Sequence, residues 1–131
     1  MSLITKTSAW AEEEHSMFAD SVSRFYDDEL VPNIDRWNDA GMVDRAFWDK
    51  AGQAGLMGGA IAEEYGGSGG CICFDSIAVY EQGARGDSGW GFSIQSIVMH
   101  YLVSFATEEQ KQRWLPKLVS GEMVAAIAMT E

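Results

Sequence analysis

Apolar residues recur at helical spacing along most of the chain and predict a bundle of about five helices. The first helix has an inner face of apolar residues whose spacings are mostly three, four or seven positions: Trp10, Met17, Phe18, Val22, Phe25 and Leu30. Ser8 can cap the start of this helix. Pro32 predicts a break or kink near its end, because proline lacks an amide hydrogen.

Four further helical segments follow, with glycines between them. Asp44 begins one segment, and residues 74–85 form another. The run 90–105 is apolar almost all round, which is typical of a helix at the centre of a bundle. The last helix begins with Thr107 and Gln110, which have the spacing of a capping box. The expected fold class is therefore all-α.

The end of the chain has a different pattern. Residues 123–129 are almost entirely apolar and too few for a bundle helix, so they are predicted to form a β-strand. A single strand leaves unpaired backbone groups along its edges. We therefore expect a helical domain over residues 1–122, with 1–7 as a tag or disordered segment. Residues 123–131 are expected to be the first strand of a further, truncated β domain.

Composition and charge narrow the class of protein. The 131 residues are 47% hydrophobic, which suits one compact domain. The net charge is −11, and eleven acids with three arginines between positions 12 and 49 give that segment −8. Such a surface repels a phosphate backbone, so nucleic-acid binding is not expected. No apolar run approaches the length of a membrane span, and no secretory signal is visible.

Few side chains indicate chemistry on their own. Cys71 and Cys73 are separated by one residue, a spacing that strains a disulfide. Neither His15 nor His100 stands at a recognisable metal-ligand spacing, so free thiols in a reducing compartment and no metal site are expected. His100 lies in an apolar run and is expected to be a core histidine with its hydrogen bonds satisfied.

A glycine-rich loop follows the acidic pair Glu63-Glu64. Residues 66–70 contain four glycines, but they lack the Gly-Lys-Ser/Thr and G-x-G-x-x-G patterns of phosphate-binding loops. A tight turn between helices is therefore expected. Adjacent carboxylates point apart on a strand or a helix, so the acidic pair is expected to be solvated rather than an acid/base pair.

Several short motifs follow one another along the chain. They are Trp37, Ala40-Gly41, residues 48–58, 63–70, 91–99, 108–111, Leu115-Pro116, Gly121-Glu122 and residues 126–131. In this order and at these separations they resemble the amino-terminal helical domain of acyl-CoA dehydrogenases, over residues 18–131. The closing segment is similar to the start of that family's flavin-binding signature, T-E-P-x-x-G-S-D. Residues 92–99 and 126–131 are most similar to the long-chain branch.

The resemblance implies an FAD-dependent enzyme that oxidises acyl-CoA thioesters to trans-2-enoyl-CoA. In this family a glutamate base removes the α-proton while the β-hydrogen leaves as hydride to flavin N5, in a pocket that excludes water. The resemblance also implies electron transfer to an electron-transfer flavoprotein and a homotetramer. The expected location is the cytoplasm of a bacterium or the mitochondrial matrix.

Site residues are also implied by the resemblance. The residues expected to line the substrate pocket are Trp90, Ser93, Ser96 and Ile97, and those expected to contact FAD are Ile127, Met129 and Thr130. The family's catalytic base has no counterpart in these 131 residues, so no catalytic residue is assigned. The isolated chain is therefore expected to be inactive.

A protein of another class fits the same observations. The chain can be a stand-alone, non-catalytic helical interaction module that keeps the dehydrogenase scaffold. Its apolar segment 123–129 would then pair with a partner or with a second copy of the chain.

Overall fold

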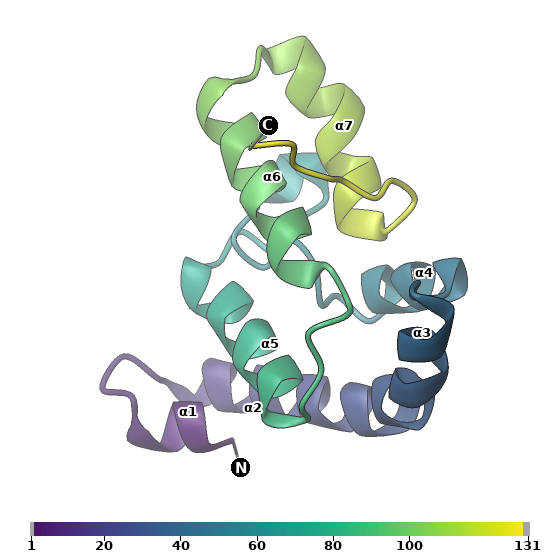
Figure 1. Cartoon of the computed structure of the whole chain (residues 1–131). Coiled ribbons are helices and arrows are strands. Elements are labelled where there is room, and N and C mark those ends of the chain that lie inside the picture. Colours follow the sequence, from purple (N-terminus) through teal and green to yellow (C-terminus); the bar gives the residue numbers. More distant parts are fainter. Residues whose placement is uncertain (1, 130–131) are drawn as a thin grey trace.

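The computed structural model describes residues 2–129, which form an arrangement of helices joined by loops (Figure 1). The helices are α1 (Leu3–Thr7), α2 (Glu13–Phe25), the π-helical turn η1 (Tyr26–Leu30), the 3-10 turn η2 (Val31–Asn33), α3 (Ile34–Ala40), α4 (Arg45–Gln53), the 3-10 turn η3 (Glu63–Tyr65), α5 (Ile72–Ala84), α6 (Phe92–Phe105) and α7 (Glu108–Ser120). In Figure 1, α1 and α2 lie at one end of the molecule, α6 and α7 lie at the other, and α5 connects them. The predicted all-α fold is confirmed.

The start of the chain differs from the sequence prediction. Residues 3–7, expected to be a tag or disordered, form the short helix α1, which lies against α2 and α5. Ser8 does not cap α2, because its backbone N–H ends α1 by donating to Ile4 O at 3.1 Å. Helix α2 begins five residues later with Glu12 as its N-cap. There the Glu12 N–H donates to Nδ1 of His15 at 3.1 Å, which completes a capping box.

The break predicted at Pro32 is confirmed and takes a specific form. After Phe25 the backbone loosens into the π-helical turn η1, and Pro32 then lies in the first turn of η2, where its missing N–H removes no hydrogen bond. A separate helix, α3, follows and ends at Gly41, whose φ of 67° lies in the left-handed region. The sequence did not predict α3, because seven residues are too few to establish a helical period.

The hydrophobic core is built around Trp90, which is 2% exposed. Its ring makes edge-on contacts with three others, at centroid distances of 4.9 Å to Phe47, 5.5 Å to Trp48 and 5.9 Å to Tyr26. Edge-to-face packing of this kind adds to the free energy gained from burying the rings. The cluster therefore joins η1, α4 and the loop before α6 into one core.

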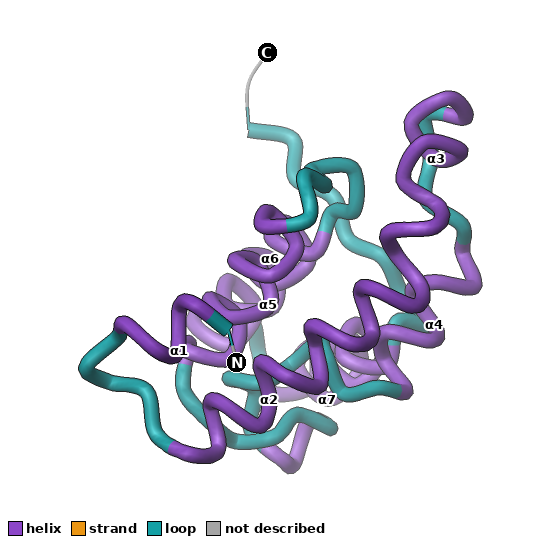
Figure 2. The backbone as a smooth tube through the Cα atoms, turned by 90° about the horizontal axis from the view of Figure 1, so that it is seen from below, coloured by secondary structure: helices purple, strands orange, loops and turns teal. Residues whose placement is uncertain are grey.

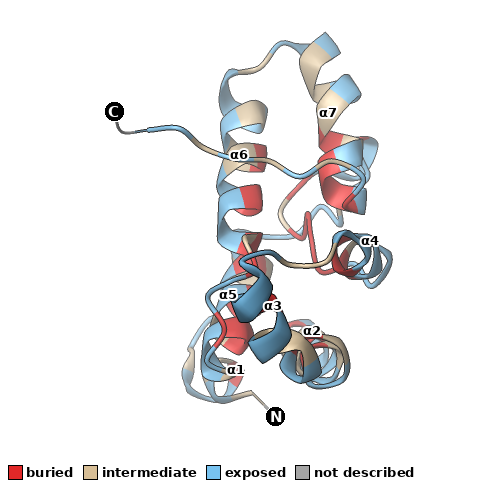
Figure 3. Ribbon diagram, turned by 45° about the vertical axis from the view of Figure 1, so that its right-hand side comes forward, coloured by how far each residue is buried: buried red, intermediate tan, exposed pale blue. Residues whose placement is uncertain are grey.

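Helix α6 is not the central helix that its sequence predicts. It buries Phe92, Gln95, Ser96 and Met99, and Figure 3 shows its other side exposed. The large apolar side chains on that exposed side are Ile94, Ile97, Tyr101 and Phe105. Within residues 2–129 no element covers this apolar face. The molecule thus carries an open apolar surface along one helix.

The glycine loop forms the tight turn that was predicted. Gly66 has a φ of 87°, and Gly67 packs so closely that a Cβ atom would lie 2.0 Å from the carbonyl oxygen of Ile61. The backbone N–H groups of Gly69 and Gly70 donate to carbonyls of the preceding segment at 2.8 and 2.9 Å. These amides are used inside the loop and are not turned toward a phosphate.

The segment predicted as a strand is an extended loop. Residues 123–129 are drawn as a loop in Figure 2, and no strand occurs in the part of the chain that the structure describes. The side chain of Gln95, which is fully buried, forms hydrogen bonds with the backbone of this segment, as a neighbouring strand would. Its Nε2 donates to the carbonyls of Leu118 and Met123 at 2.9 and 2.8 Å, and its Oε1 accepts the Ala125 N–H at 2.8 Å. The strand prediction is wrong here because a β-ladder needs a second strand.

Candidate functional site

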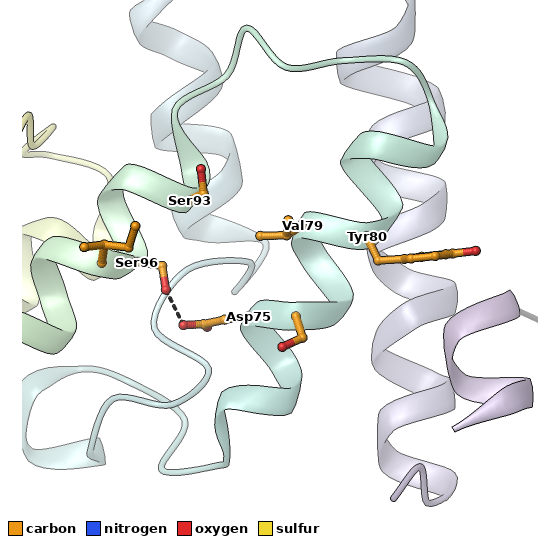
Figure 4. Close-up of a pocket in the computed structure, with 7 residues that line it drawn as sticks. Asp75, Val79, Tyr80, Ser93 and Ser96 are labelled. Carbon is orange, nitrogen blue, oxygen red and sulfur yellow. Dashed lines mark hydrogen bonds between the residues drawn. The ribbon is translucent and has the colours of Figure 1, made fainter. Parts of the chain in front are cut away.

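Helices α5 and α6 enclose a groove of about 450 Å³ (Figure 4). The residues that line it are Asp75, Ser76, Val79, Tyr80, Ser93, Ser96 and Ile97. Val79 and Ile97 are 42% and 43% exposed, so apolar surface is accessible to a ligand. The groove therefore offers a largely apolar wall with a small number of polar groups, which is the usual composition of a ligand site.

Three of the four predicted substrate-pocket residues line this groove. Ser93, Ser96 and Ile97 are three and four positions apart on α6 and so share one face of the helix. Trp90 precedes α6 and lies in the core, where it contacts other aromatic rings. The structure brings the first three together, and it places Trp90 behind them as support for the start of α6.

A polar cluster crosses the groove from α5 to α6. The Ser96 hydroxyl donates to Oδ2 of Asp75 at 2.5 Å, as the dashed line in Figure 4 marks, and Nε2 of His100 lies 3.0 Å from the same oxygen. Asp75 is 6% exposed, and its second oxygen, Oδ1, is buried without a hydrogen-bond partner in the described structure. His100 is therefore the half-buried partner of a buried carboxylate, with its side chain 33% exposed. The prediction of a core histidine is correct only in that its ring is hydrogen-bonded.

A second groove continues along α6 from the first. Its volume is about 320 Å³, and the residues that line it are Ile72, Ser96, Ile97, His100, Tyr101, Ser104 and Phe105. The two grooves share Ser96 and Ile97. Tyr101 is 53% exposed and Phe105 is 81% exposed. Ile97, Tyr101 and Phe105 thus form an exposed apolar strip along α6. Exposed apolar surface of this kind marks a site for a ligand or a partner protein.

The predicted FAD residues lie in the extended segment after Ala125. Ile127 is half-buried, and Met129 is 76% exposed. Thr130 lies outside the described residues, so its contacts stay a prediction. Within residues 2–129, no hydrogen bond joins the segment after Ala125 to the helices. Its backbone N–H and C=O groups are therefore available to another group.

Comparison with known proteins shows the family. The family model described as "Acyl-CoA dehydrogenase, N-terminal domain" matches residues 12–122. The chain belongs to the acyl-CoA dehydrogenase family. The long-chain specific mitochondrial acyl-CoA dehydrogenase of Rattus norvegicus is 41% identical over 119 residues, which are 90% of this chain and 28% of that protein. The mitochondrial isovaleryl-CoA dehydrogenase of Solanum tuberosum is 36% identical and covers 95% of this chain and 31% of its own length.

The fold of this acyl-CoA dehydrogenase domain matches solved structures. The acyl-CoA dehydrogenase of Geobacillus kaustophilus superposes with a TM-score of 0.90 at 37% identity, over 95% of this chain and 33% of that one. A glutaryl-CoA dehydrogenase from Mycobacterium smegmatis, solved in complex with FADH2, has the same fold with a TM-score of 0.78 at 24% identity. The chain spans about a third of the length of these proteins. Among residues 2–129, none of the helices combines the length and apolar character that a membrane crossing needs.

The α5 wall of the groove in this acyl-CoA dehydrogenase domain, formed by Asp75, Ser76, Val79 and Tyr80, was not predicted from the sequence. A local signal was present, because Asp75 is an acid between Phe74 and Ile77 on the face of a predicted helix that should be apolar. Its partners, Ser96 and His100, stand 21 and 25 positions later. Only the pairing of α5 with α6 brings them together, so sequence spacing alone did not identify the cluster.

Proposed function

We propose that this chain is the amino-terminal domain of an FAD-dependent acyl-CoA dehydrogenase and that the α5–α6 groove holds the acyl part of the substrate. The observation that carries the proposal is the apolar strip on α6, which no other described element covers. A fatty acyl chain is matched to such a surface, because each buried methylene contributes roughly 0.8 kcal/mol. The relatives that are 41% identical over 119 residues and are named long-chain specific also support it.

Within this proposal, the groove residues have distinct roles. Ile97 contributes the central apolar contact, since it lines both grooves. Ser93 and Ser96 form the polar side of the α6 face, where Ser96 is already engaged by Asp75. Asp75 positions α5 against α6 through its contacts with Ser96 and His100 and is not assigned as the base that removes a proton.

The segment after Ala125 fits a contact with FAD. Flavin rings carry hydrogen-bonding atoms at their edge, and the unused backbone groups of Ile127 and Met129 have the matching donors and acceptors. When bound, FAD would supply the redox chemistry of the reaction. We expect Ile127 to pack beside the flavin and Met129 to contact it through its backbone. Thr130, the next residue, is expected to contact the flavin as well.

An acyl-chain-length series tests the groove assignment. We expect calorimetric titration of the 131-residue chain with butanoyl-, octanoyl- and hexadecanoyl-CoA to give affinity that rises with chain length, and CoA alone to bind more weakly than any of them. Ile97→Ser should weaken hexadecanoyl-CoA binding by about tenfold, because it removes apolar contact from both grooves. Val103→Ser is the matched control, since Val103 is on α6 and 38% exposed but lines neither groove. Affinity that does not depend on chain length would contradict the proposal.

The chain alone is expected to have no dehydrogenase activity, because it supplies no assigned base and only part of the FAD contacts. The measurement is turnover of an acyl-CoA with a dye as electron acceptor in the presence of added FAD. Measurable turnover would show that the base lies within these 131 residues. For the complete enzyme we propose, from the family resemblance, electron transfer to an electron-transfer flavoprotein, a homotetramer, and a location in a bacterial cytoplasm or the mitochondrial matrix. Relatives named as mitochondrial and a relative from Bacillus subtilis support the two locations.

The open face of α6 also favours a second function. A stand-alone helical interaction module would use this face and residues 123–129 to bind a partner or a second copy of the chain. Sedimentation of the chain over a range of concentrations tests this alternative. Reversible self-association that Phe105→Ser abolishes would support the module, whereas a monomer at every concentration counts against pairing of two copies.

A further inference from the structure

Two cysteines and a histidine meet where α2 passes the start of α5. The sulfur atoms of Cys71 and Cys73 and a ring nitrogen of His15 all lie within 4.8 Å of one another. The Cys71 Sγ is 3.6 Å from His15 Nε2, although the two residues are 56 positions apart. Sequence spacing does not reveal this cluster, because only the packing of α2 on α5 brings His15 to the two thiols.

The orientation of His15 is fixed by its surroundings. Its Nδ1 accepts the backbone N–H of Glu12, so the neutral ring carries its proton on Nε2, the nitrogen that faces Cys71. The ring is stacked on Phe74 at a centroid distance of 5.0 Å, and Trp10 contacts it edge-on at 5.3 Å. His15 is 5% exposed. The buried Nε2 donor thus lies 3.6 Å from the Cys71 sulfur and 4.0 Å from Oε1 of Glu14, so the sulfur is the nearer of the two acceptors.

Cys71 is the thiol best placed to ionise. It is the N-cap of α5, and its sulfur accepts the backbone N–H of Cys73 at 3.3 Å. Burial raises the pKa of the Cys71 thiol, but hydrogen bonds from the Cys73 thiol, from His15 and from the Cys73 N–H outweigh that effect and lower it below its ordinary value. The bond to Cys71 raises the pKa of Cys73. The two thiols are therefore unequal, and Cys71 is also the exposed one.

We propose that Cys71 and Cys73 form a peroxide-reactive dithiol, with Cys71 as the nucleophile and Cys73 as the resolving thiol. The Cys71 thiolate attacks one oxygen of hydrogen peroxide, the O–O bond breaks, and hydroxide leaves, so that the sulfur is oxidised to a sulfenic acid. The Cys73 thiolate then attacks the Cys71 sulfur, the S–S bond forms, and the sulfenic oxygen leaves as hydroxide. A thiol reductant reverses the step, and the strain of a bridge over one intervening residue favours that reversal.

The same cluster is less suited to a metal ion. Coordination by His15 Nε2 needs a free lone pair there, which would move the ring proton to Nδ1. The Glu12 N–H already points at Nδ1, so two N–H groups would then face each other. Histidines that bind metals instead direct the second ring N–H to an acceptor. The capping box of α2 thus favours a histidine that donates to a thiolate.

Single-cysteine variants of the 131-residue chain test the roles of the two thiols. We expect iodoacetamide at pH 7 to alkylate Cys71 in the Cys73→Ser variant about tenfold faster than Cys73 in the Cys71→Ser variant. One equivalent of hydrogen peroxide should convert the wild-type chain to an internal disulfide. The Cys73→Ser variant should stop at a sulfenic acid that a cyclic diketone probe traps. Equal alkylation rates, or disulfides formed only between chains, would overturn the proposal.

The His15→Gln variant tests whether His15 increases the reactivity of Cys71. His15→Gln keeps a capping-box residue at the third position of α2, so the helix should still form. We expect this variant to slow alkylation of Cys71 several-fold and to raise the midpoint of its pH–rate profile. Ser21→Ala is the control on α2, where Ser21 is exposed, and it should leave the rate unchanged. If one equivalent of Zn²⁺ protects both thiols from alkylation, the cluster is a metal site and the proposal is wrong.

Discussion

At the scale of single residues, Gln95 has more influence on the backbone than any other polar side chain of α6. Its amide is fully buried and bonds three backbone groups, which belong to the end of α7 and to the segment after it. A buried amide of this kind is stabilising only while all of its partners are present. Residues 123–125 are therefore held by this side chain together with the hydrogen bond from the Met123 N–H to the carbonyl of Lys117, at 2.9 Å.

Replacement of Gln95 by leucine should be destabilising and local. Gln95→Leu removes the amide but fills a similar volume, and it leaves the Met123 carbonyl and the Ala125 N–H without partners. We expect a loss of about 1–3 kcal/mol in the free energy of unfolding, measured by urea denaturation, together with faster amide exchange at Ala125. Gln53→Leu is the control, because Gln53 is exposed at the end of α4. An equal loss in both variants would show that the effect is not due to these hydrogen bonds.

At the scale of elements, a hydrogen bond from Tyr65 joins the turn η3 to the start of α7. The Tyr65 hydroxyl lies 2.9 Å from both carboxylate oxygens of Glu108, the first residue of α7. This hydrogen bond raises the pKa of Tyr65 to about 12 and lowers the pKa of Glu108. Both shifts describe the same pairing of a neutral phenol with a charged carboxylate.

The contribution of this pair to stability should depend on pH at both extremes. For Tyr65, with its pKa raised from 10.0 to about 12, the contribution is complete below pH 10 and is lost as the pH rises toward 12. For Glu108, with its pKa lowered, the contribution is lost as the pH falls through its folded-state pKa, below the usual 4.5. Denaturation of the wild-type chain and the Tyr65→Phe variant across this range tests the effect. We expect their difference to be largest near neutral pH and to shrink at both ends, and a constant difference would contradict the assignment.

Elements with local signals could be predicted from the sequence, whereas those defined by distant contacts could not. Thr107 caps α7 and Asp44 precedes α4, because caps act within one turn of a helix. Helix α1 lacks such a signal and depends on packing against α2 and α5. In the groove, Ser93, Ser96 and Ile97 share a face that helical spacing defines. The pairing of Asp75 with His100, and of Cys71 with His15, needs the tertiary fold.

At the scale of the whole molecule, negative charge opposes folding. The chain has 20 acids and 9 basic residues, and residues 27–29 place three acids in the single turn η1. Compaction brings these charges together, so repulsion is greater in the folded state than in the extended chain. Exposed ion pairs, such as Arg36 with Asp44, offset little of this repulsion.

Added salt should therefore stabilise the chain. The range of charge interactions falls from roughly 30 Å at 0.01 M to about 8 Å at 0.15 M ionic strength, which screens the repulsion. We expect the melting temperature to rise over this range, to the same extent in NaCl and KCl, since the effect depends on ionic strength. A melting temperature that falls would mean that specific ion pairs outweigh the net charge.

The contacts of Gln95 also make the two edges of the segment 123–125 different from each other. In an extended segment, alternate residues direct their backbone groups to the same side. Met123 and Ala125 are alternate residues, and both bond to Gln95. The side of the segment that carries the groups of Val124 is thus turned away from α6. A strand that pairs with this segment would therefore approach the edge that carries the backbone groups of Val124, because Gln95 occupies the other edge.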